Sequence, residues 1–289
     1  MHVTFRTALR SLAVAASALA IAATGAVTAH AEPSGAWTLD APYYGWEVVP
    51  DEGVWYSSPR GTHLVPDAAY FRGVHGLFGG GRGSLGYPTG PVRAQTASDG
   101  YDNAYQTFER GTIYSSQFGG VGMPASSSIT QHYNRNGGGG GAYGYPTSHE
   151  VRQAPGWWYQ KFTFSTVYAS RYGTHGVTGA LGVEHLLQGG GGGALGYPTA
   201  PRRWDAAGYS YQTFERGNVY CVSSADGDRC STVRGGFVDV HQRNGGGRGL
   251  LGYPMGDEYY DPWTNSWWQA FEHRLVEISP TGVSVMIWP

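Results

Sequence analysis

The stretch that decides the fold is "GGGGGALGYPT", residues 189–199, in which five glycines precede a short apolar phrase. Closely related stretches begin at Gly79, Gly137 and Gly245. In all four copies the glycine before Tyr-Pro lies seven positions after the first glycine. A flexible linker is insensitive to one residue more or less. The constant spacing therefore predicts a defined backbone path, and the four copies predict a repeat protein.

A phosphate-binding loop is the other interpretation of such a glycine run. That loop requires a Gly-Lys-Ser/Thr ending or a strand-to-helix dinucleotide fingerprint. Here Lys161 is the only lysine in the chain, and each glycine run leads into Tyr-Pro. The sequence therefore argues against nucleotide binding, and no cofactor is expected.

A second phrase follows each glycine run and is typical of a β-hairpin, as in "YQTFERGTIYSS" from Tyr105. With Arg110-Gly111 as a two-residue turn, Phe108 faces Ile113 on the core side. The turn type stays open in the copies with Phe164-Ser165 and His273-Arg274, which lack the glycine. The same alternation predicts a set of outward-facing aromatic residues: Tyr105, Tyr114, Tyr159, Tyr168, Tyr211, Tyr220 and Trp268. Four further tryptophans vary between copies and are thus not tied to repeat packing: Trp157, Trp158, Trp204 and Trp267.

A short amphipathic helix is expected between each hairpin and the next glycine run. Val183, Leu186 and Leu187 occur at positions i, i+3 and i+4, which would place them on one apolar face. Glycine then ends the helix because it accepts the left-handed C-cap conformation. The same spacing recurs in two other copies, with Val74, Leu77 and Phe78, and with Ile129, His132 and Tyr133.

A partial unit from Tyr43 precedes the first full repeat, so four glycine phrases accompany five hairpin-like segments. We expect an α+β repeat protein with four full units and one split unit, each built from a short helix, a glycine-rich turn and a β-hairpin. Joining the two ends would hide the sheet edges. The expected architecture is therefore a closed, five-fold pseudo-symmetric, propeller-like disc.

Residues 1–31 have the pattern of a signal peptide, with Arg6 and Arg10 before an apolar run and Ala29-His30-Ala31 at the expected cleavage site. Residues 32–42 would be an N-terminal segment, and residues 43–289 a single repeat domain. No other apolar run is long enough for a membrane span, so export without membrane insertion is expected. Removing residues 1–31 moves the formal charge from −2 to about −4, which leaves no basic surface for nucleic acid.

Cys221 and Cys230 are the only cysteines, and in an exported chain they are expected to form a disulfide that closes a short loop. The alternative, a pair of thiolate metal ligands, lacks a second pair of ligands at a zinc-like spacing. Asp226 and Asp228 inside this loop offer two carboxylates, which are too few for calcium. No metal site is expected.

The repeated glycine phrases and the hairpins that follow them resemble the LGFP repeat family. The resemblance rests on the four Gly-Tyr-Pro phrases with the Gln-x-Phe-Glu-Arg-Gly hairpin after them, and it extends from about Trp37 to the C-terminus. Two features depart from the family pattern. Tyrosine replaces the phenylalanine of the name in all four copies, which adds a hydroxyl that needs a partner if buried. The Tyr-Trp-Ser strand lacks its tryptophan in the three copies that carry the tyrosine. The four phrases are Leu85-Gly86-Tyr87-Pro88, Tyr143-Gly144-Tyr145-Pro146, Leu195-Gly196-Tyr197-Pro198 and Leu251-Gly252-Tyr253-Pro254.

The resemblance implies a non-catalytic module of the actinobacterial cell envelope. In similar proteins the module is attached to mycolyltransferases or peptidoglycan amidases and is thought to hold them to arabinogalactan. We therefore expect a secreted, cell-wall-associated protein that binds wall glycan, either arabinogalactan-type polysaccharide or peptidoglycan, with an envelope protein as a further partner. The outward aromatic residues would supply multivalent stacking contacts with sugar rings. Alternatively, these rings pack against the neighbouring unit.

Two other functions stay open: a secreted wall hydrolase of amidase or esterase type, and a secreted protein that acts on a host or a competitor. A hydrolase needs a unique constellation of residues. Gly-Thr-His occurs twice, at His63 and His175, which favours a role in a loop. His149-Glu150 is not followed by the second histidine of a zinc protease, and the chain has no Gly-x-Ser-x-Gly. No catalytic residue is predicted.

Overall fold

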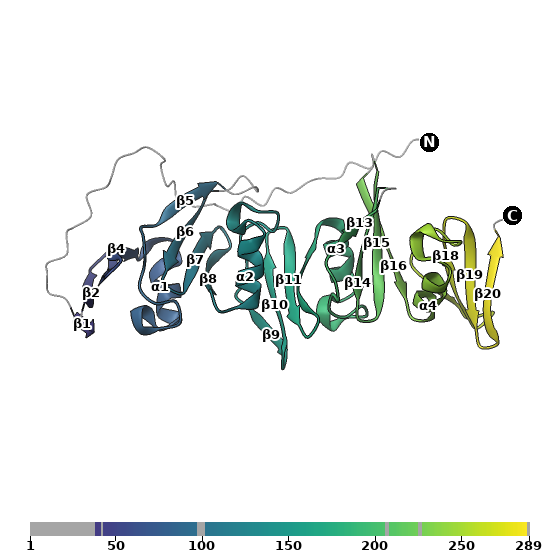
Figure 1. The fold of residues 1–289 in the computed structure, drawn as a ribbon, viewed down its shortest axis with the longest axis horizontal. Helices are drawn as coiled ribbons and strands as arrows, with labels where there is room; N and C mark the ends of the chain where they lie inside the picture. Colours follow the sequence, from purple (N-terminus) through teal and green to yellow (C-terminus); the bar gives the residue numbers. More distant parts are fainter. Residues whose placement is uncertain (1–37, 42, 97–101, 206–207, 225–226, 288–289) are drawn as a thin grey trace, which may run out of the picture. The chain divides into compact units, whose positions relative to one another are not determined.

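The computed structural model describes residues 38–41, 43–96, 102–205, 208–224 and 227–287. Within these ranges the chain forms five antiparallel sheets of four strands each, and every sheet is a meander in sequence order. Figure 1 labels most of these strands and the helix that follows each of the first four sheets. The predicted signal peptide, residues 1–31, and residues 32–37 lie outside the described residues.

The four strands of each sheet follow one another along the chain. The first sheet contains β1 (Thr38–Ala41), β2 (Tyr44–Val49), β3 (Gly53–Ser58) and β4 (Gly61–Pro66). The second contains β5 (Arg93–Thr96), β6 (Asp102–Phe108), β7 (Gly111–Ser116) and β8 (Gly119–Pro124). The third contains β9 (Val151–Ala154), β10 (Trp157–Phe162), β11 (Ser165–Ser170) and β12 (Gly173–Thr178). The fourth contains β13 (Arg203–Trp204), β14 (Tyr209–Phe214), β15 (Gly217–Ser224) and β16 (Gly227–Arg234). The fifth contains β17 (Tyr259–Asp261), β18 (Ser266–Ala270), β19 (Arg274–Ser279) and β20 (Gly282–Ile287).

Four α-helices connect successive sheets: α1 (Phe71–Leu77), α2 (Ser128–Arg135), α3 (Gly179–Leu187) and α4 (Gly236–Arg243). A single turn of 3₁₀ helix lies in each glycine run, and another precedes α1. These turns are η1 (Ala68–Tyr70), η2 (Gly80–Arg82), η3 (Gly138–Gly140), η4 (Gly190–Gly192) and η5 (Gly246–Arg248). Each unit thus contains the predicted helix, glycine turn and hairpin, and the hairpin is the centre of a larger sheet.

The predicted hairpin turn at Arg110-Gly111 is wrong. Phe108 pairs with Gly111 and Gln106 pairs with Ile113, so the two-residue loop is Glu109-Arg110. The backbone N–H groups of these two loop residues donate to the carbonyls of Tyr87 and Leu85. The turn is therefore held by the preceding apolar phrase. A displacement of two positions preserves the face of a strand, so Phe108 and Ile113 are still both buried on one side.

The glycines of "GGGGG" occupy different steric environments. Gly189 ends α3 in the left-handed region, at φ 90°, as predicted. A Cβ at Gly193 would lie 1.9 Å from the carbonyl oxygen of Gln188, and one at Gly191 would lie 2.6 Å from the ring of Tyr197. The position of Gly192 carries Arg82 and Arg248 in the first and last copies. The run is therefore a packed part of the scaffold with one position open to substitution.

Sheets two to four are buried on both faces. In the second sheet, Phe108 and Ile113 pack with residues of the first sheet. Tyr114 and Met123, on the opposite face, pack with α2 and the third sheet. The prediction of one outward face is therefore wrong for these sheets. The four junctions between successive sheets, numbered here in chain order, each contain one helix and one glycine phrase, which explains why five sheets accompany four phrases.

Closure into a disc is not confirmed. Among the described strands, each sheet is an open meander that pairs only with itself. The coarser expectation of repeated units of helix, turn and small antiparallel sheet is confirmed.

The predicted apolar face of α3 is also wrong. Leu181, Gly182 and His185 are the buried residues of this helix. Val183 and Leu186, which were expected to be buried, have exposed fractions of 59% and 51%, and Leu187 is exposed as well. The helix packs between two sheets and not on one surface, so small and flat side chains fill its contact face. In α2 the expected Ile129 and Tyr133 are buried, whereas Leu77 of α1 is exposed.

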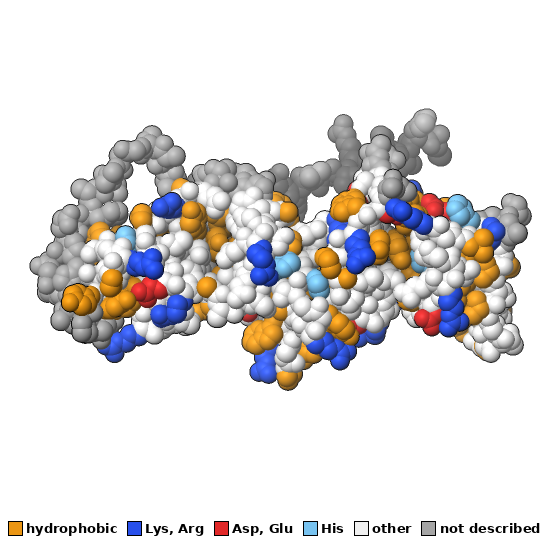
Figure 2. Space-filling model, viewed as in Figure 1, with side chains coloured by type: hydrophobic (Ala, Val, Ile, Leu, Met, Phe, Trp, Pro, Cys, Tyr) orange, Lys and Arg blue, Asp and Glu red, His pale blue; other side chains and the backbone are white. Residues whose placement is uncertain are grey.

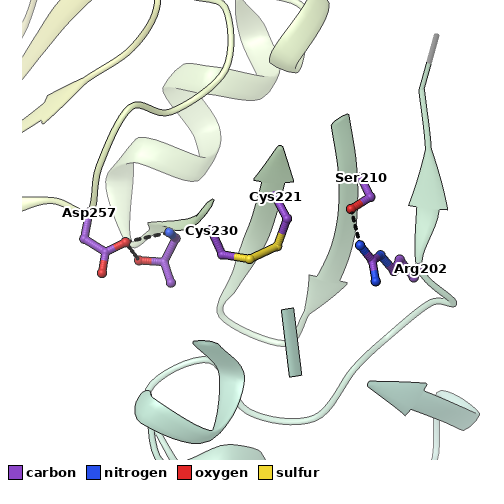
Figure 3. The surroundings of a disulfide bond; sticks show 6 residues. Arg202, Ser210, Cys221, Cys230 and Asp257 are labelled. Carbon is purple, nitrogen blue, oxygen red and sulfur yellow. Dashed lines mark hydrogen bonds between the residues drawn. A yellow bond between two sulfur atoms is a disulfide. The ribbon is translucent and has the colours of Figure 1, made fainter. Parts of the chain in front are cut away.

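The predicted disulfide is confirmed. Cys221 on β15 lies directly opposite Cys230 on β16, with a Cα–Cα distance of 4.1 Å. Figure 3 shows the disulfide with the hydrogen-bonded pair Arg202 and Ser210 on one side and Asp257 on the other. Asp257 accepts a hydrogen bond from the hydroxyl of Thr232. The bond therefore connects neighbouring strands of a single sheet.

Replacing both cysteines with serine tests the contribution of this bond, and serine is the residue at the position of the second sheet equivalent to Cys221, Ser115. On the chain-entropy model, a disulfide that closes a loop this short stabilises the folded state by about 2 to 3 kcal/mol. We expect the free energy of unfolding in urea to fall by that amount while the far-UV circular dichroism of the native protein stays the same. Loss of the native spectrum at 25 °C would instead mean that the disulfide holds the whole fold together.

Candidate functional site

A tetrad of aromatic rings fills each junction. In the third junction, Tyr168 makes edge contacts with His185 and Tyr197, each at a centroid distance of 5.2 Å. His185 stacks on Phe214 at 4.5 Å, and its Nε2 lies 2.8 Å from the carbonyl oxygen of Gly196. The first and fourth junctions repeat this pattern around His75 and His241, and in the second Tyr133 takes the place of the histidine.

The Gln-x-Phe-Glu-Arg phrase fastens the next sheet to this tetrad. Gln212 Nε2 donates to the carbonyl oxygens of Gly176, at 3.2 Å, and Ala200, at 2.9 Å. The backbone N–H of Tyr197 donates to Glu215 Oε2 at 3.0 Å. Arg216 donates to the carbonyls of Ala194 and Gly193 in the glycine turn. The repeated phrase is therefore structural.

The hydroxyl groups that distinguish the tyrosines of this chain from the family's phenylalanines have partners in two copies. Tyr145 donates to Gln95 Oε1 at 2.8 Å, and Tyr197 donates to Gln153 Oε1 at 2.7 Å. The expectation that a buried hydroxyl finds an acceptor is confirmed at these two positions.

The three junction histidines are held neutral. Burial lowers the pKa of His75, His185 and His241, and the hydrogen bond to the glycine carbonyl opposes that shift only partly. The unfolded chain takes up protons near the ordinary histidine pKa of 6.5, whereas these native sites resist protonation. Protonation therefore favours the unfolded state.

We expect the free energy of unfolding to be at its full value above about pH 7 and to decrease as the pH falls below about 6.5. The decrease should be at most about 1.4 kcal/mol per pH unit for each histidine, and it should end at the lowered native pKa. Urea unfolding at about pH 7.5 and about pH 5.5 measures it. His185→Tyr, which introduces the residue type of Tyr133, should reduce the dependence. An unchanged dependence in that variant would contradict this assignment.

Six of the seven predicted ligand residues face a junction and not the outside, and three of these six are buried there. Tyr114, Tyr168 and Tyr220 are buried in the second, third and fourth junctions. Burial raises the pKa of Tyr114 and of Tyr220 to about 12 and raises that of Tyr168 as well. Their rings contact the tyrosine of the following glycine phrase. The alternative of packing against the neighbouring unit therefore holds for these three residues.

The other four predicted ligand residues, Tyr105, Tyr159, Tyr211 and Trp268, are half-buried. Each of these tyrosines lies opposite one of the buried tyrosines on the adjacent strand. Tyr159 lines a cavity of about 160 Å³ beside the third glycine run. Trp268 lies opposite Glu277 on the fifth sheet. Their role in binding stays a prediction.

A larger, open groove lies at the fourth sheet and was not foreseen. It has a volume of about 930 Å³ and runs between the hairpin loop at Glu215-Arg216 and α4. Its lining includes Thr199, Thr213, Asn218, Arg234, Gln242, Glu258 and Trp267.

Charged and aromatic groups meet in this groove. Arg234 forms an ion pair with the largely buried Glu258. Trp267 has an exposed fraction of 46% and lies 5.3 Å from the ring of Tyr260. Glu215 and Arg216 also form hydrogen bonds within the scaffold. Because they belong to a repeated phrase, the sequence indicated only this structural role and not that they line a groove. Trp267 was the available signal, because it varies between copies. The expectation that such tryptophans are not tied to repeat packing is wrong for Trp157 and Trp158, which pack against the junction clusters.

The residues weighed for catalysis have structural roles. His63 and His175 bond to the carbonyls of Arg60 and Tyr172 and so close their hairpin loops, as predicted. In a cavity of about 530 Å³, the Ser127 hydroxyl donates to Glu150 and caps α2, and the ring of His149 lies 5.9 Å from that of Phe78. Within the described ranges, no hydrogen bond joins His149 to Ser127. Nor does any group of three potential metal ligands occur among the described residues.

Sheets, helices and glycine turns that recur with the same contacts define a tandem-repeat protein. The model of the LGFP repeat family matches residues 195–249, which run from the third glycine phrase to the fourth glycine run. The resemblance is therefore confirmed for residues 195–249, which match an LGFP repeat. Among curated proteins, none matches the chain. None of the helices in the described part of the chain combines the length and the apolar character needed to span a membrane.

Two solved structures are similar at a low level. One is the extracellular domain of a protein described as a one component system from B. thetaiotaomicron, with 7% identity and a TM-score of 0.17. The alignment covers 88% of this chain and 36% of that chain. The other is the extracellular domain described as part of a hybrid two component system from the same organism, with 8% identity, a TM-score of 0.17, and coverage of 87% and 36%. A TM-score of 0.17 is too low to show a shared fold.

Proposed function

We propose that this protein is an extracellular, non-catalytic module that binds cell-wall polysaccharide through the groove at the fourth sheet. The observation that carries the proposal is the half-exposed Trp267 in a groove that also presents Arg216, Glu215 and Gln242. An aromatic face stacks on the C–H face of a sugar ring, while charged and amide groups bind its hydroxyls. Ligand sites commonly combine an aromatic surface with a few polar groups.

Several observations support an extracellular or cell-surface location. The N-terminal sequence has the signal-peptide pattern, and the disulfide Cys221–Cys230 is stable in an oxidising compartment. Residues 195–249 match the LGFP repeat, and the resemblance to that family implies a non-catalytic envelope module. The glycan we propose is of arabinogalactan type or peptidoglycan, and an envelope enzyme recruited by this module is the second partner. The half-buried Tyr105, Tyr159, Tyr211 and Trp268 remain candidates for additional, weaker contacts.

Retention of the purified mature protein on insoluble actinobacterial wall, compared with cellulose, tests this function. Trp267→Ala should lower retention on the wall about tenfold, since stacking aromatics commonly dominate such sites. Trp263→Ala is the matched control, because Trp263 lies outside the groove and is 94% exposed. Equal retention of the wild type on wall and cellulose, or equal losses in the two variants, would refute the proposed site.

The two alternatives predict different results. A wall hydrolase would release reducing ends or peptides from the same wall, and a protein that acts on a host or competitor would be found in the culture fluid. Our proposal predicts that no reducing ends or peptides are released and that the protein stays in the wall fraction.

A further inference from the structure

The third unit has a groove at the same place as the polar groove of the fourth, but its chemistry differs. This groove has a volume of about 410 Å³ and a predominantly apolar lining. It runs between the loop at Thr163-Phe164 and α3 and includes Val177, Val183 and Leu186. Its volume falls within the range of about 300 to 1,000 Å³ that is usual for small-molecule sites.

Residue-by-residue comparison locates the difference on the groove itself. Aligning the two hairpins on Gln160 and Gln212 matches Phe164 with Arg216. Aligning the two helices on their buried histidines matches Leu186 with Gln242 and Val183 with Asp239. At the hairpin loop the third copy carries Thr163-Phe164, where the second and fourth copies carry Glu-Arg and the fifth carries Glu-His. The scaffold is thus kept while the groove has become apolar.

The apolar side chains of this groove are exposed to solvent. Phe164, Val183 and Leu186 have exposed fractions of 43%, 59% and 51%. Figure 2 shows hydrophobic side chains in several separate groups on the visible face, and not as one continuous surface. Leaving three large apolar groups together in water has a free-energy cost that burial against a ligand would recover.

Lys161 gives the groove a positive charge at one end. This residue lines both the apolar groove and the adjoining cavity of about 160 Å³, which is formed with Tyr159, Gln153 and the glycine run from Gly189. It is exposed, and no ion pair joins it to an acidic side chain within the described part of the chain. The equivalent positions in the other units carry Thr107, Thr213 and Ala270. The only lysine of the protein therefore lies on the apolar groove of the third unit and not on the polar groove of the fourth.

We propose that this groove binds an anionic amphiphile, with its acyl chain against Phe164, Val183 and Leu186 and its charged head at Lys161. The charge and the apolar surface are adjacent, which matches a molecule that has both and disfavours a free sugar or a free anion. The site is separate from the proposed glycan groove, so either proposal can fail without the other.

Calorimetric titration with dodecyl phosphate below its micelle concentration tests the site. Dodecanol supplies the chain without the charge, and inorganic phosphate supplies the charge without the chain. We expect saturable binding of dodecyl phosphate at one site and at least about tenfold weaker binding of either comparison compound. Lys161→Gln should weaken dodecyl phosphate binding roughly tenfold, and higher salt should weaken it further.

Leu186→Gln introduces the residue type that the fourth unit carries and should weaken binding about fivefold through lost apolar contact. Leu187→Gln is the matched control, because Leu187 is exposed on the same helix but does not line the groove. Absence of binding, equal affinity for dodecanol, or equal losses in these two variants would overturn the proposal. So would a dimer in sedimentation that Leu186→Gln dissociates, because a second copy would then occupy the groove.

Discussion

Gly141→Ala is expected to destabilise the protein by about 4 kcal/mol. The backbone angles of Gly141 are accessible to other residues, so conformational strain is not the reason. An alanine Cβ would lie 2.0 Å from the carbonyl oxygen of Asn136 and 3.0 Å from its carbonyl carbon. Neither backbone atom can move without breaking the turn that ends α2.

The neighbouring position offers a matched control. At Gly140 the nearest atom to an added Cβ is the side-chain amide nitrogen of Gln95, at 3.3 Å, and the equivalent position carries Arg82 or Arg248 in other copies. Gly140→Ala should therefore change the free energy of unfolding by no more than about 0.5 kcal/mol. Urea titration of both variants measures the difference. Similar values for the two would show that the glycine run is not a packed path.

Gln212→Leu is expected to destabilise the protein by about 3 to 4 kcal/mol. Gln212 is fully buried, and its Nε2 satisfies the carbonyls of Gly176 and Ala200 on both sides of the third junction. Leucine fills a similar volume and leaves two carbonyl oxygens without this donor, at a cost of about 1 to 3 kcal/mol each.

Two comparisons separate the hydrogen bonds from packing in this prediction. Gln212→Glu keeps the shape but replaces the donor with an acceptor, so it should be at least as destabilising at neutral pH. Gln117→Leu changes an exposed glutamine and should have an effect within about 0.5 kcal/mol. Urea unfolding and amide exchange of the fourth sheet are the measurements. If Gln212→Leu unfolds like the wild type, the glutamine is not what fastens the two sheets.

The grooves of the third and fourth units have different surfaces on the same scaffold. The residues that hold the junction, such as His185 and His241, are repeated. The residues on the groove surface differ between copies, as Phe164 and Arg216 do. The side chains on the groove surface therefore differ between the two units although the junction histidines and their hydrogen bonds are the same.

The spacing of residues along the chain was sufficient to predict the repeated units, but not to predict which faces of their sheets and helices are buried. The equal spacing from Gly189 to Gly196 correctly predicted a fixed turn, and the alternation around Phe108 correctly predicted a buried strand face. The outward assignment of Tyr114 was wrong because alternation says which residues share a face and not whether the other face is also covered. The helix face of α3 was wrong for the same reason, since His185 is buried between two sheets while Leu186 is exposed.

The sequence by itself determined the repeat, the glycine turn and the disulfide Cys221–Cys230, because each depends on local spacing along the chain. It did not determine where the units begin, since β1 (Thr38–Ala41) of the first sheet lies in the segment expected to precede the repeat domain. Only the tertiary structure decided which surfaces stay open to a ligand. Packing one sheet against the next buries Tyr168 and leaves Trp267 and Phe164 on grooves, and that outcome depends on contacts between residues far apart in the chain, which no local pattern encodes.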